Sequence, residues 1–317
     1  MDSICFKFNP PQDDFEQCVQ ISYKNEHWKM ANGDYEAFLK GFAGFTLFVA
    51  IDKNTEKVVG FCTFSTQITL NTKEEINTFG CFFVLPEYRS LGIGAKLWNL
   101  AVGRKFQEGK NITLSALTKM IPYYASRGFT ICQTEPGLYI EFSPNAVNRN
   151  TLNELRDLLL TEYFEVKDVT TVTNDALNEY DRQVVPVDRS LYTPVWLRRS
   201  DSFTKVGVDV KGNVVGYACL RQVVGNRLIY SPIFAKEKKI AFSLFLATLD
   251  AVPGLEKYNV VICGANKGND AIVEIISSVT DGTFKQAVAT LRMFTKEAIN
   301  ADMSQVFGLT SYGCVSA

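Results

Sequence analysis

Two spacings of apolar positions alternate along the first half of the chain. Short apolar or alternating runs predict strands, and apolar residues at every third or fourth position predict helices. The expected strands are residues 4–8, 45–51, 58–64, 78–85 and 112–116, with a closing hairpin at 131–133 and 138–142. The expected helices are residues 13–24, 93–109 and 120–127. This alternation is typical of an α/β fold with a mixed sheet.

A polar, turn-rich stretch at residues 143–150 is followed by a second half in which the pattern partly recurs. The run Val-Val-Gly-Phe-Cys at 58–62 has a counterpart in Val-Val-Gly-Tyr-Ala at 214–218. The further counterparts are 228–232 for the strand before Pro86, 240–249 for the helix after it, and 260–263 for the strand at 112–116. We therefore predict a tandem duplication of one fold, with domains at residues 1–145 and 146–317. Chance similarity between two unrelated α/β halves is the alternative.

The most informative segment follows the strand that stops at Pro86. It reads Arg-Ser-Leu-Gly-Ile-Gly at residues 89–94 and opens the helix at 93–109. Glycines let backbone N–H groups approach a phosphate closely, and the N-terminus of a helix favours an anion. A structural turn before an amphipathic helix is the alternative. The segment lacks the third glycine of a dinucleotide site and the Gly-Lys-Ser/Thr of a Walker loop.

Composition and charge narrow the choice of chemistry. The 317 residues suffice for two domains, and 33 Lys and Arg against 34 Asp and Glu give no basic excess. We therefore expect no nucleic-acid and no anionic-membrane partner. The one histidine, His27, excludes a multi-histidine zinc site, and we expect it to be a surface or packed residue.

Cysteine usage and the absence of targeting signals bear on the compartment. The eight cysteines form no Cys-x-x-Cys pair, and most lie in apolar surroundings, so we expect buried thiols in a reducing compartment. The N-terminus lacks the pattern of a signal peptide, and the apolar stretch at 240–252 is too short and too polar to span a bilayer. A cytoplasmic protein is the expectation.

Two motifs together resemble the GNAT superfamily, the general-control-type N-acetyltransferases. The first is Val-Leu-Pro at 84–86 with Arg-x-x-Gly-x-Gly at 89–94, and the second is Tyr-x-x-x-Gly-Phe at 124–129. The resemblance covers residues 1–142. It implies that loop amides hold the pyrophosphate of acetyl-CoA and that the preceding strand binds the pantetheine arm. The implied cofactor-binding residues are Phe83, Val84, Leu85, Arg89, Ser90, Leu91, Gly92, Ile93, Gly94 and Ala95.

The resemblance also implies direct attack of an amine on the thioester. Tyr124 matches the position that often protonates the leaving thiolate; a packing role is the alternative, and the neighbouring Tyr123 competes for the assignment. The family often uses a glutamate near this strand, or a water chain, as base. Glu75 is the candidate here, and the alternative is that Glu74 and Glu75 are a solvated loop pair. Cys81 is expected to point into the core.

The early helices of this family line the acceptor cleft, which implies substrate contacts in this region. The candidates there are Glu26, Trp28, Asp34 and Tyr35. A charge-dense segment at 180–189 resembles a part of two-domain members that closes over the cleft. It adds Asp188 and Arg189 as substrate candidates, and the alternative is that they pair with each other and cap a helix.

The second copy lacks Gly-x-Gly at residues 232–241, so we expect a degenerate GNAT-like domain without a cofactor of its own. Residues 264–269 resemble a phosphate loop only superficially. The sequence thus predicts an acetyl-CoA-dependent N-acetyltransferase for a small-molecule primary amine, without a metal, as a monomer or homodimer. The alternatives are a non-catalytic acyl-CoA-binding or scaffold protein and a protein or peptide N-acetyltransferase. Longer acyl donors also fit, because the loop reads only the CoA end.

Overall fold

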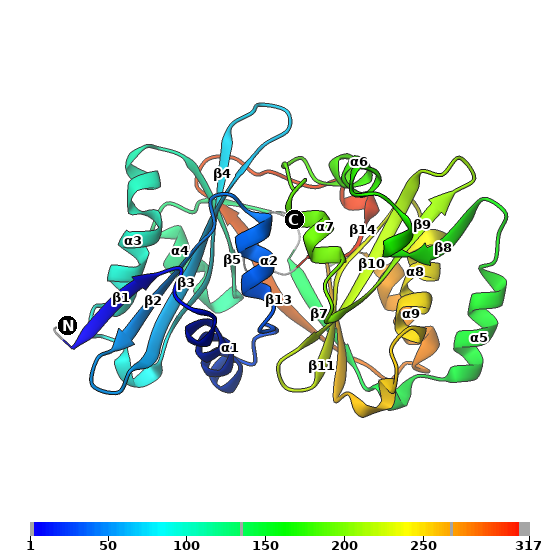
Figure 1. Ribbon diagram of the computed structural model, residues 1–317, viewed down its shortest axis with the longest axis horizontal. Helices are drawn as coiled ribbons and strands as arrows, with labels where there is room; N and C mark the ends of the chain where they lie inside the picture. The colour runs from blue at the N-terminus through cyan, green and yellow to red at the C-terminus, as the bar shows by residue number, and fades with distance from the viewer. Residues whose placement is uncertain (1–2, 134–135, 267–268, 311–317) are drawn as a thin grey trace.

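The computed structural model describes residues 3–133, 136–266 and 269–310, and it consists of two similar halves side by side (Figure 1). The first half contains β1 (Ile4–Phe8), α1 (Gln12–Glu26), α2 (Asp34–Gly41), β2 (Thr46–Asp52), β3 (Lys57–Ile68), β4 (Glu75–Val84), α3 (Ile93–Gln107), β5 (Asn111–Ala116), α4 (Ile121–Ala125), β6 (Ile131–Cys132) and β7 (Gly137–Phe142). The second contains α5 (Arg149–Leu158), β8 (Phe164–Asp168), α6 (Asn174–Val184), α7 (Tyr192–Leu197), β9 (Ser202–Asp209), β10 (Val214–Val223), β11 (Arg227–Ala235), α8 (Lys238–Asp250), β12 (Val260–Asn266), α9 (Asp270–Val279), β13 (Lys285–Phe294) and β14 (Val306–Gly308).

Both halves have the same strand order. The first runs β1-β2-β3-β4-β5, and the second runs β8-β9-β10-β11-β12. Each is an antiparallel meander that ends in one parallel pair, β4 with β5 and β11 with β12. A parallel pair requires a crossover, which α3 and α8 supply. The predicted mixed α/β fold and its tandem duplication are confirmed.

Two strands cross between the halves and join the sheets. β7 pairs with β12 and β13, and β13 pairs also with β5 and β6 (Figure 1). The expected hairpin of residues 131–133 and 138–142 is therefore wrong, because β6 and β7 both pair with β13 and not with each other. Sequence spacing favours the local partner, but β13, distant in the sequence, lies beside both.

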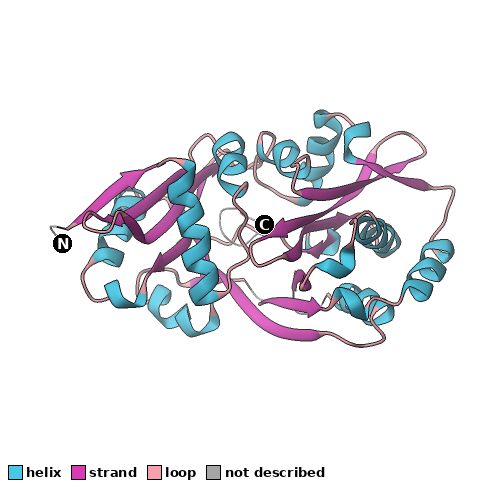
Figure 2. Ribbon diagram, turned by 60° about the horizontal axis from the view of Figure 1, so that its bottom comes forward, coloured by secondary structure: helices cyan, strands magenta, loops and turns pink. Residues whose placement is uncertain are grey.

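Helices cover both faces of the strand layer (Figure 2). In β2, Leu47 and Val49 belong to the apolar cluster under α1 and α2, whereas Phe48 and Ala50 belong to the cluster under α3 and α4. Successive side chains of a strand point to opposite faces, so a strand between two helical layers is apolar on both. This explains the continuous apolar run of β2.

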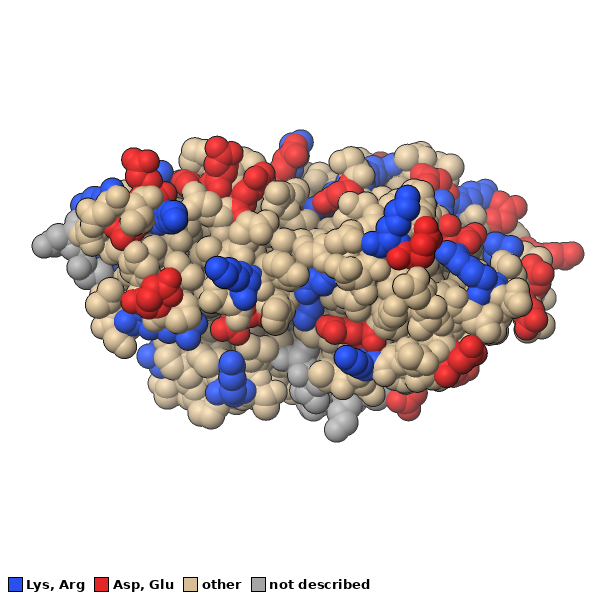
Figure 3. All heavy atoms as spheres, turned by 90° about the horizontal axis from the view of Figure 1, so that it is seen from below, with Lys and Arg blue, Asp and Glu red and all other residues tan. Residues whose placement is uncertain are grey.

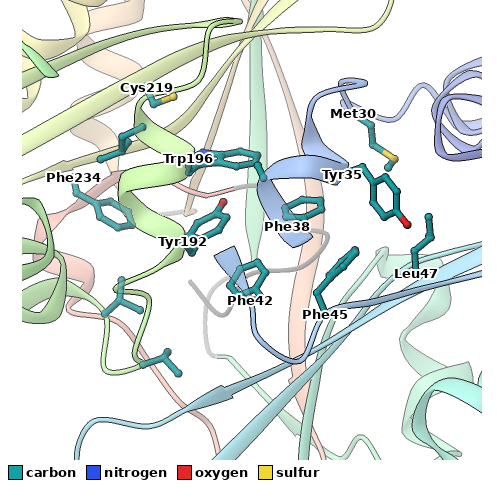
Figure 4. Close-up of a cluster of buried hydrophobic side chains, with 14 of the residues drawn as sticks. Met30, Tyr35, Phe38, Phe42, Phe45, Leu47, Tyr192, Trp196, Cys219 and Phe234 are labelled. Carbon is teal, nitrogen blue, oxygen red and sulfur yellow. The ribbon is translucent and has the colours of Figure 1, made fainter. Parts of the chain in front are cut away.

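The halves also meet through an aromatic contact between α2 and α7 (Figure 4). Phe38 stacks on Trp196 with ring centroids 5.7 Å apart, and Phe42 stacks on Tyr192 at 4.6 Å. A Cβ at Gly41 would lie 2.9 Å from the Cα of Tyr192, so a glycine is needed for this close approach. One apolar cluster therefore spans both halves.

Candidate active site

β4 and β5 separate partway along their length. They pair only from residues 76–78 to residues 111–113. Beyond that point β4 has a bulge at Cys81 and Phe82 opposite Cys62, and Cys81 has φ +49°. A bulge bends its strand and changes the direction of a side chain. The result is a cleft between the splayed strands, with α4 along one side.

The expectation for Cys81 holds only in part. Its side chain packs against the apolar cluster under α1 and α2, but it is half-buried and also lines the cleft. Simple alternation along β4 predicts an inward side chain, and the extra residue of the bulge breaks that alternation. Cys81 also lines a second pocket, described below, and so it lies where the two meet.

The turn after Pro86 has the features of an anion site. Ser90 and Gly92 have positive φ, +66° and +81°, and Gly92 is the N-cap of α3. The first N–H groups of a helix have no partner within it, and the helix dipole favours an anion there. A Cβ at Gly92 would meet nothing within 4 Å, so the space beside the turn is open. These residues fit a pyrophosphate group.

Arg89 connects this turn with the end of β4. Its Nε donates to the carbonyl oxygen of Val84 at 3.0 Å, and its guanidinium lies 3.8 Å from the carboxylate of Glu26. The positive charge therefore lies in the wall of the cleft, where an anionic ligand benefits from it.

The predicted cofactor residues gather at this cleft, with one difference. Phe83, Val84, Arg89 and Ser90 line it, and residues 91–95 form the turn and the first residues of α3. Leu85 is different, because its N–H donates to the carbonyl oxygen of Val59 on β3. That amide is thus already paired, and the Leu85 side chain packs against the core.

Two neighbouring tyrosines of α4 line the cleft. Tyr124 is 8% exposed and its ring stacks on Trp98 with centroids 6.2 Å apart. Burial raises the pKa of Tyr124 to about 12, so the phenol stays protonated at neutral pH. The guanidinium of Arg127 instead lies over the ring of Tyr123, 3.6 Å from the ring centroid. Both side chains reach the same cleft, and Tyr124 is the buried one.

The structure does not bring Glu75 to Tyr124. Glu75 begins β4, where its carboxylate pairs with Lys105 at 2.6 Å, whereas the cleft opens at the other end of the strand. Eight residues of strand separate Glu75 from Phe83, which is about 26 Å at 3.3 Å per residue. Among the described residues that line the cleft, the one carboxylate belongs to Glu26, the last residue of α1. The sequence pointed to Glu26 only as a substrate contact.

The segment 27–30 after α1 is held by the second half. Arg227 donates to the carbonyl oxygens of His27 at 3.2 Å and Trp28 at 2.6 Å. Arg221 donates to the carbonyl oxygen of Lys29 at 3.2 Å, and the N–H of Val224 donates to that of Met30 at 2.9 Å. Four successive carbonyl groups are thus fixed by groups from β10, β11 and their connection. His27 itself ends α1 with φ +54°, which is a structural role.

A second pocket continues from the cleft into the space between the halves. Glu26, Trp28, Cys81, Ser115 and Leu117 line both. The described residues that line only the second pocket are Lys29, Met30, Tyr139, Ile229, Tyr230, Gly264, Thr290, Leu309 and Thr310. Most of these come from strands distant in the sequence, so no local pattern could reveal them. We name this space the interdomain pocket.

Four predicted substrate residues have structural roles instead. Asp34 is buried and accepts from Arg199 and Arg221, both at 2.8 Å, while the Tyr35 hydroxyl donates to the carbonyl oxygen of Pro10. Arg189 is buried against Asp181, and Asp188 accepts from the N–H of Ser190. Within the described residues, none of the four lines the cleft or the interdomain pocket. The predicted alternative of a direct Asp188–Arg189 pair is wrong as well, because Arg189 pairs with Asp181.

Two strands of the second half, β11 and β12, separate in the same way as β4 and β5, but another strand of the second half lies between them. β11 and β12 pair from residues 227–230 to residues 260–263, and a bulge at residues 231–232 lies opposite Cys219. Beyond the bulge β14 pairs with β11 at Ile233 and Phe234, and the N–H of Leu309 donates to Gly264 of β12 at 2.7 Å. β14 thus lies between the splayed strands, where the first half has its cleft. Residues 267–268, within the segment compared with a phosphate loop, lie outside the described residues.

The surface carries no large field of one sign on the face shown in Figure 3, where acidic and basic side chains are interspersed. Over the described part of the chain, no helix is long and apolar enough to cross a membrane. The same residues contain no group of three or more His, Cys, Asp or Glu side chains that could hold a metal ion.

Comparison with known proteins identifies the family. Two models of the acetyltransferase (GNAT) domain match the sequence, one at residues 43–131 and one at residues 177–308. No curated protein matches it. The chain belongs to the GNAT superfamily and is a two-domain member of it. It is therefore placed among the acyl-CoA-dependent acetyltransferases, which use acetyl-CoA in general.

Solved structures show the same fold over nearly the whole chain. A putative acetyltransferase from Pyrococcus horikoshii has a TM-score of 0.66 at 14% identity, covering 99% of this chain and 97% of its own. A tandem GNAT protein from the clavulanic acid biosynthesis pathway has a TM-score of 0.58 at 15% identity, covering 92% of this chain and 97% of its own. At these identities the similarity establishes the fold alone.

Proposed function

We propose that this chain is an N-acetyltransferase that transfers an acetyl group from acetyl-CoA to a small-molecule primary amine. The observation that carries the proposal is the continuity of the β4–β5 cleft, which ends at the Gly92 turn, with the interdomain pocket. A donor in the cleft and an acceptor in the pocket would meet at Cys81, Ser115 and Glu26, which line both.

Glu26 at this junction and Tyr124 in the cleft can supply the proton transfers. When bound, acetyl-CoA supplies an acetyl group already activated as a thioester. Glu26 can hold an ammonium group and accept its proton, directly or through water, so that the amine nitrogen becomes nucleophilic. The phenol Oη of Tyr124 can donate to the sulfur that leaves.

The second half has a defined part in the proposed function. Its arginines hold the segment 27–30, and β7, β11 and residues 309–310 form walls of the interdomain pocket. Since β14 occupies its own splay, the second half supports a scaffold role toward the acceptor rather than a second donor site.

Two measurements test the proposal. Acetyl-CoA at about 100 times its Kd should stabilise the protein by about 2.7 kcal/mol, which raises Tm by several degrees. Free thiol should then be released when a library of primary amines is added. A rise in Tm without thiol release from any amine would favour a non-catalytic acyl-CoA-binding protein. Release that requires a lysine-containing peptide would favour a peptide acetyltransferase. No rise in Tm would contradict the proposed donor.

A further inference from the structure

The interdomain pocket has one charge of each sign in an otherwise uncharged wall. Among its described lining residues, Glu26 is the one acidic residue and Lys29 is the one basic residue. Glu26 also lines the cleft, whereas Lys29 lines only the interdomain pocket. The negative end of the pocket therefore lies next to the donor, and the positive end lies away from it.

The ammonium of Lys29 is held in place but only loosely paired. It lies 3.9 Å from the centroid of the Tyr139 ring, which is also a wall of the pocket. Its closest carboxylate within the described residues is Glu141 at 3.9 Å, beyond hydrogen-bonding distance, and the Lys29 side chain is 19% exposed. The carbonyl oxygen of Lys29 accepts from Arg221, which fixes the backbone at this position. Burial lowers the pKa of Lys29, in keeping with a partly desolvated cation.

The two charged residues belong to one short segment of the chain. Glu26 and Lys29 are three residues apart, so their Cα atoms lie within about 11 Å of each other, and both residues line the same pocket. Between them the remaining wall is mainly apolar, with Trp28, Ile229 and Leu309 among its members. A ligand that matches this arrangement carries a cation, an anion and an apolar body in one molecule.

We propose that the acceptor is an amino acid with an apolar side chain. Its amine lies at Glu26 beside the donor cleft, its carboxylate pairs with Lys29, and its side chain packs on the apolar wall. This substrate class rests on the proposed function. A polyamine fits less well, because its second ammonium would lie beside Lys29.

The transfer balances with groups already named. The ammonium loses one proton to Glu26, directly or through water, and the neutral nitrogen forms a bond with the acetyl carbon. As the carbon–sulfur bond breaks, the nitrogen gives up a second proton to water, and the leaving sulfur, which accepts a hydrogen bond from Tyr124, takes up one proton from water. The products are an N-acetyl amino acid, whose carboxylate remains on Lys29, and a free thiol.

The test compares three acceptors of one shape: leucine, leucinamide and 3-methylbutylamine. Thiol release from acetyl-CoA should show kcat/KM for leucine about 10- to 100-fold above the other two, which lack the carboxylate, because a hydrogen bond to a charged group is worth about 1.5–3 kcal/mol. Lys29→Met should remove this advantage, and Lys29→Arg should retain most of it. Glu141→Gln is the matched control, and it should keep or increase the preference because it removes the competing anion.

The outcomes separate the inference from the proposed function. Thiol release with all three acceptors at equal kcat/KM, or a preference that survives in Lys29→Met, overturns the amino-acid acceptor and leaves the N-acetyltransferase in place. Thiol release with none of these acceptors and with no other amine, although acetyl-CoA raises Tm, overturns both. The rise in Tm with acetyl-CoA should be the same in Lys29→Met and in the unchanged protein, which shows that a lost preference is not lost folding.

Discussion

Tyr124 has two properties that act in opposite directions on its role as a proton donor. Burial raises its pKa to about 12, which keeps the phenol protonated. An ordinary thiol has a pKa near about 8.5, so complete proton transfer from Tyr124 to a thiolate would be uphill by about 3.5 pKa units, or about 5 kcal/mol. The hydrogen bond to the developing negative charge on sulfur, rather than the completed transfer, is therefore the assistance that Tyr124 offers.

Tyr124→Phe tests that role. We expect kcat to fall about 100-fold, within the range for loss of a positioned proton donor, while the Kd of acetyl-CoA stays within about twofold. Steady-state kinetics and calorimetric titration measure the two quantities. Tyr123→Phe is the control on the adjacent residue and should retain most of the activity. A larger fall in kcat for Tyr123→Phe than for Tyr124→Phe would assign the role to Tyr123.

The same burial makes stability depend on alkaline pH. The folded-state pKa of Tyr124, about 12, lies above the unfolded value of about 10, so between these values the folded state binds more protons. Stability is thus fully present below pH 10 and is lost as pH rises toward 12, by about 1.4 kcal/mol for this group at pH 11. Urea unfolding at pH 9 and pH 11 measures it. The free energy of unfolding should decrease less between these two pH values in Tyr124→Phe than in the unchanged protein. An equal decrease in the two proteins would contradict the raised pKa of Tyr124.

At the scale of elements, the segment that leads from β4 into α3 contains two glycines with different roles, Gly92 at the N-cap and Gly94 in the first turn of the helix. Gly92 has φ +81°, which residues with a side chain rarely adopt, whereas a Cβ at Gly94 would lie 3.4 Å from the ring of Phe82, an ordinary contact. Gly92 is therefore required by its backbone conformation, and Gly94 is not. The motif in the sequence makes the two look equivalent.

Gly92→Ala and Gly94→Ala form a matched pair. We expect Gly92→Ala to lower the free energy of unfolding by about 1–2 kcal/mol, because alanine is strained in the left-handed conformation. We also expect it to weaken acetyl-CoA binding about tenfold or more, because the amides of the turn shift. Gly94→Ala should fold with nearly unchanged stability and bind acetyl-CoA more tightly than Gly92→Ala. Thermal unfolding and calorimetric titration measure both. Equal losses in the two variants would show that Gly94 also has to lack a side chain.

The segment 27–30 is an element whose conformation depends on the other half. Arg227→Gln removes the guanidinium bonds to the carbonyl oxygens of His27 and Trp28. We expect the KM of the acceptor to rise about tenfold, consistent with loss of charged hydrogen bonds, with little change in the Kd of acetyl-CoA. Arg198→Gln removes a similar bond, to the carbonyl oxygen of Val172, away from the pocket and is the control. A change in Kd alone would contradict this positioning role.

At the scale of the whole molecule, the two copies of the fold differ in the space between their separated strands, which is open in the first half and occupied in the second. In the first half the space beside β4 is a cleft, and in the second half β14 pairs with β11 in the equivalent place. The exchange of β7 and β13 between the sheets also joins the two halves in one continuous sheet. The second half therefore contributes walls and anchoring arginines to a single site.

Calorimetric titration with CoA counts the sites. We expect one molecule bound per chain, because the glycine turn is absent from the second half and β14 occupies its splay. Gly92→Ala should raise the Kd of CoA at this site. Two CoA molecules bound per chain, or a Kd that Gly92→Ala leaves unchanged, would contradict the assignment of the donor site to the first half.

Much of the fold and the donor side of the site could be predicted from the sequence because these features are local. Strand and helix periodicity predicted the strands and helices up to Ala116 except α2, and the motif at 89–94 predicted the turn at the start of α3. The base candidate failed for a geometric reason: Glu75 is close to the motif in sequence but at the far end of an extended strand. The bulge at Cys81 likewise has no signal in the apolar pattern.

The sequence by itself determined the duplicated α/β fold, the glycine turn and the tyrosines of α4, since each depends on residues close together in the chain. Only the tertiary structure decided which strands β6 and β7 pair with, which carboxylate faces the cleft and how the segment 27–30 is held. It also decided that β14 fills the second splay. The physical reason is that hydrogen bonds and burial act between neighbours in space, and β13, β14, Arg221 and Arg227 reach their partners only after the chain has folded.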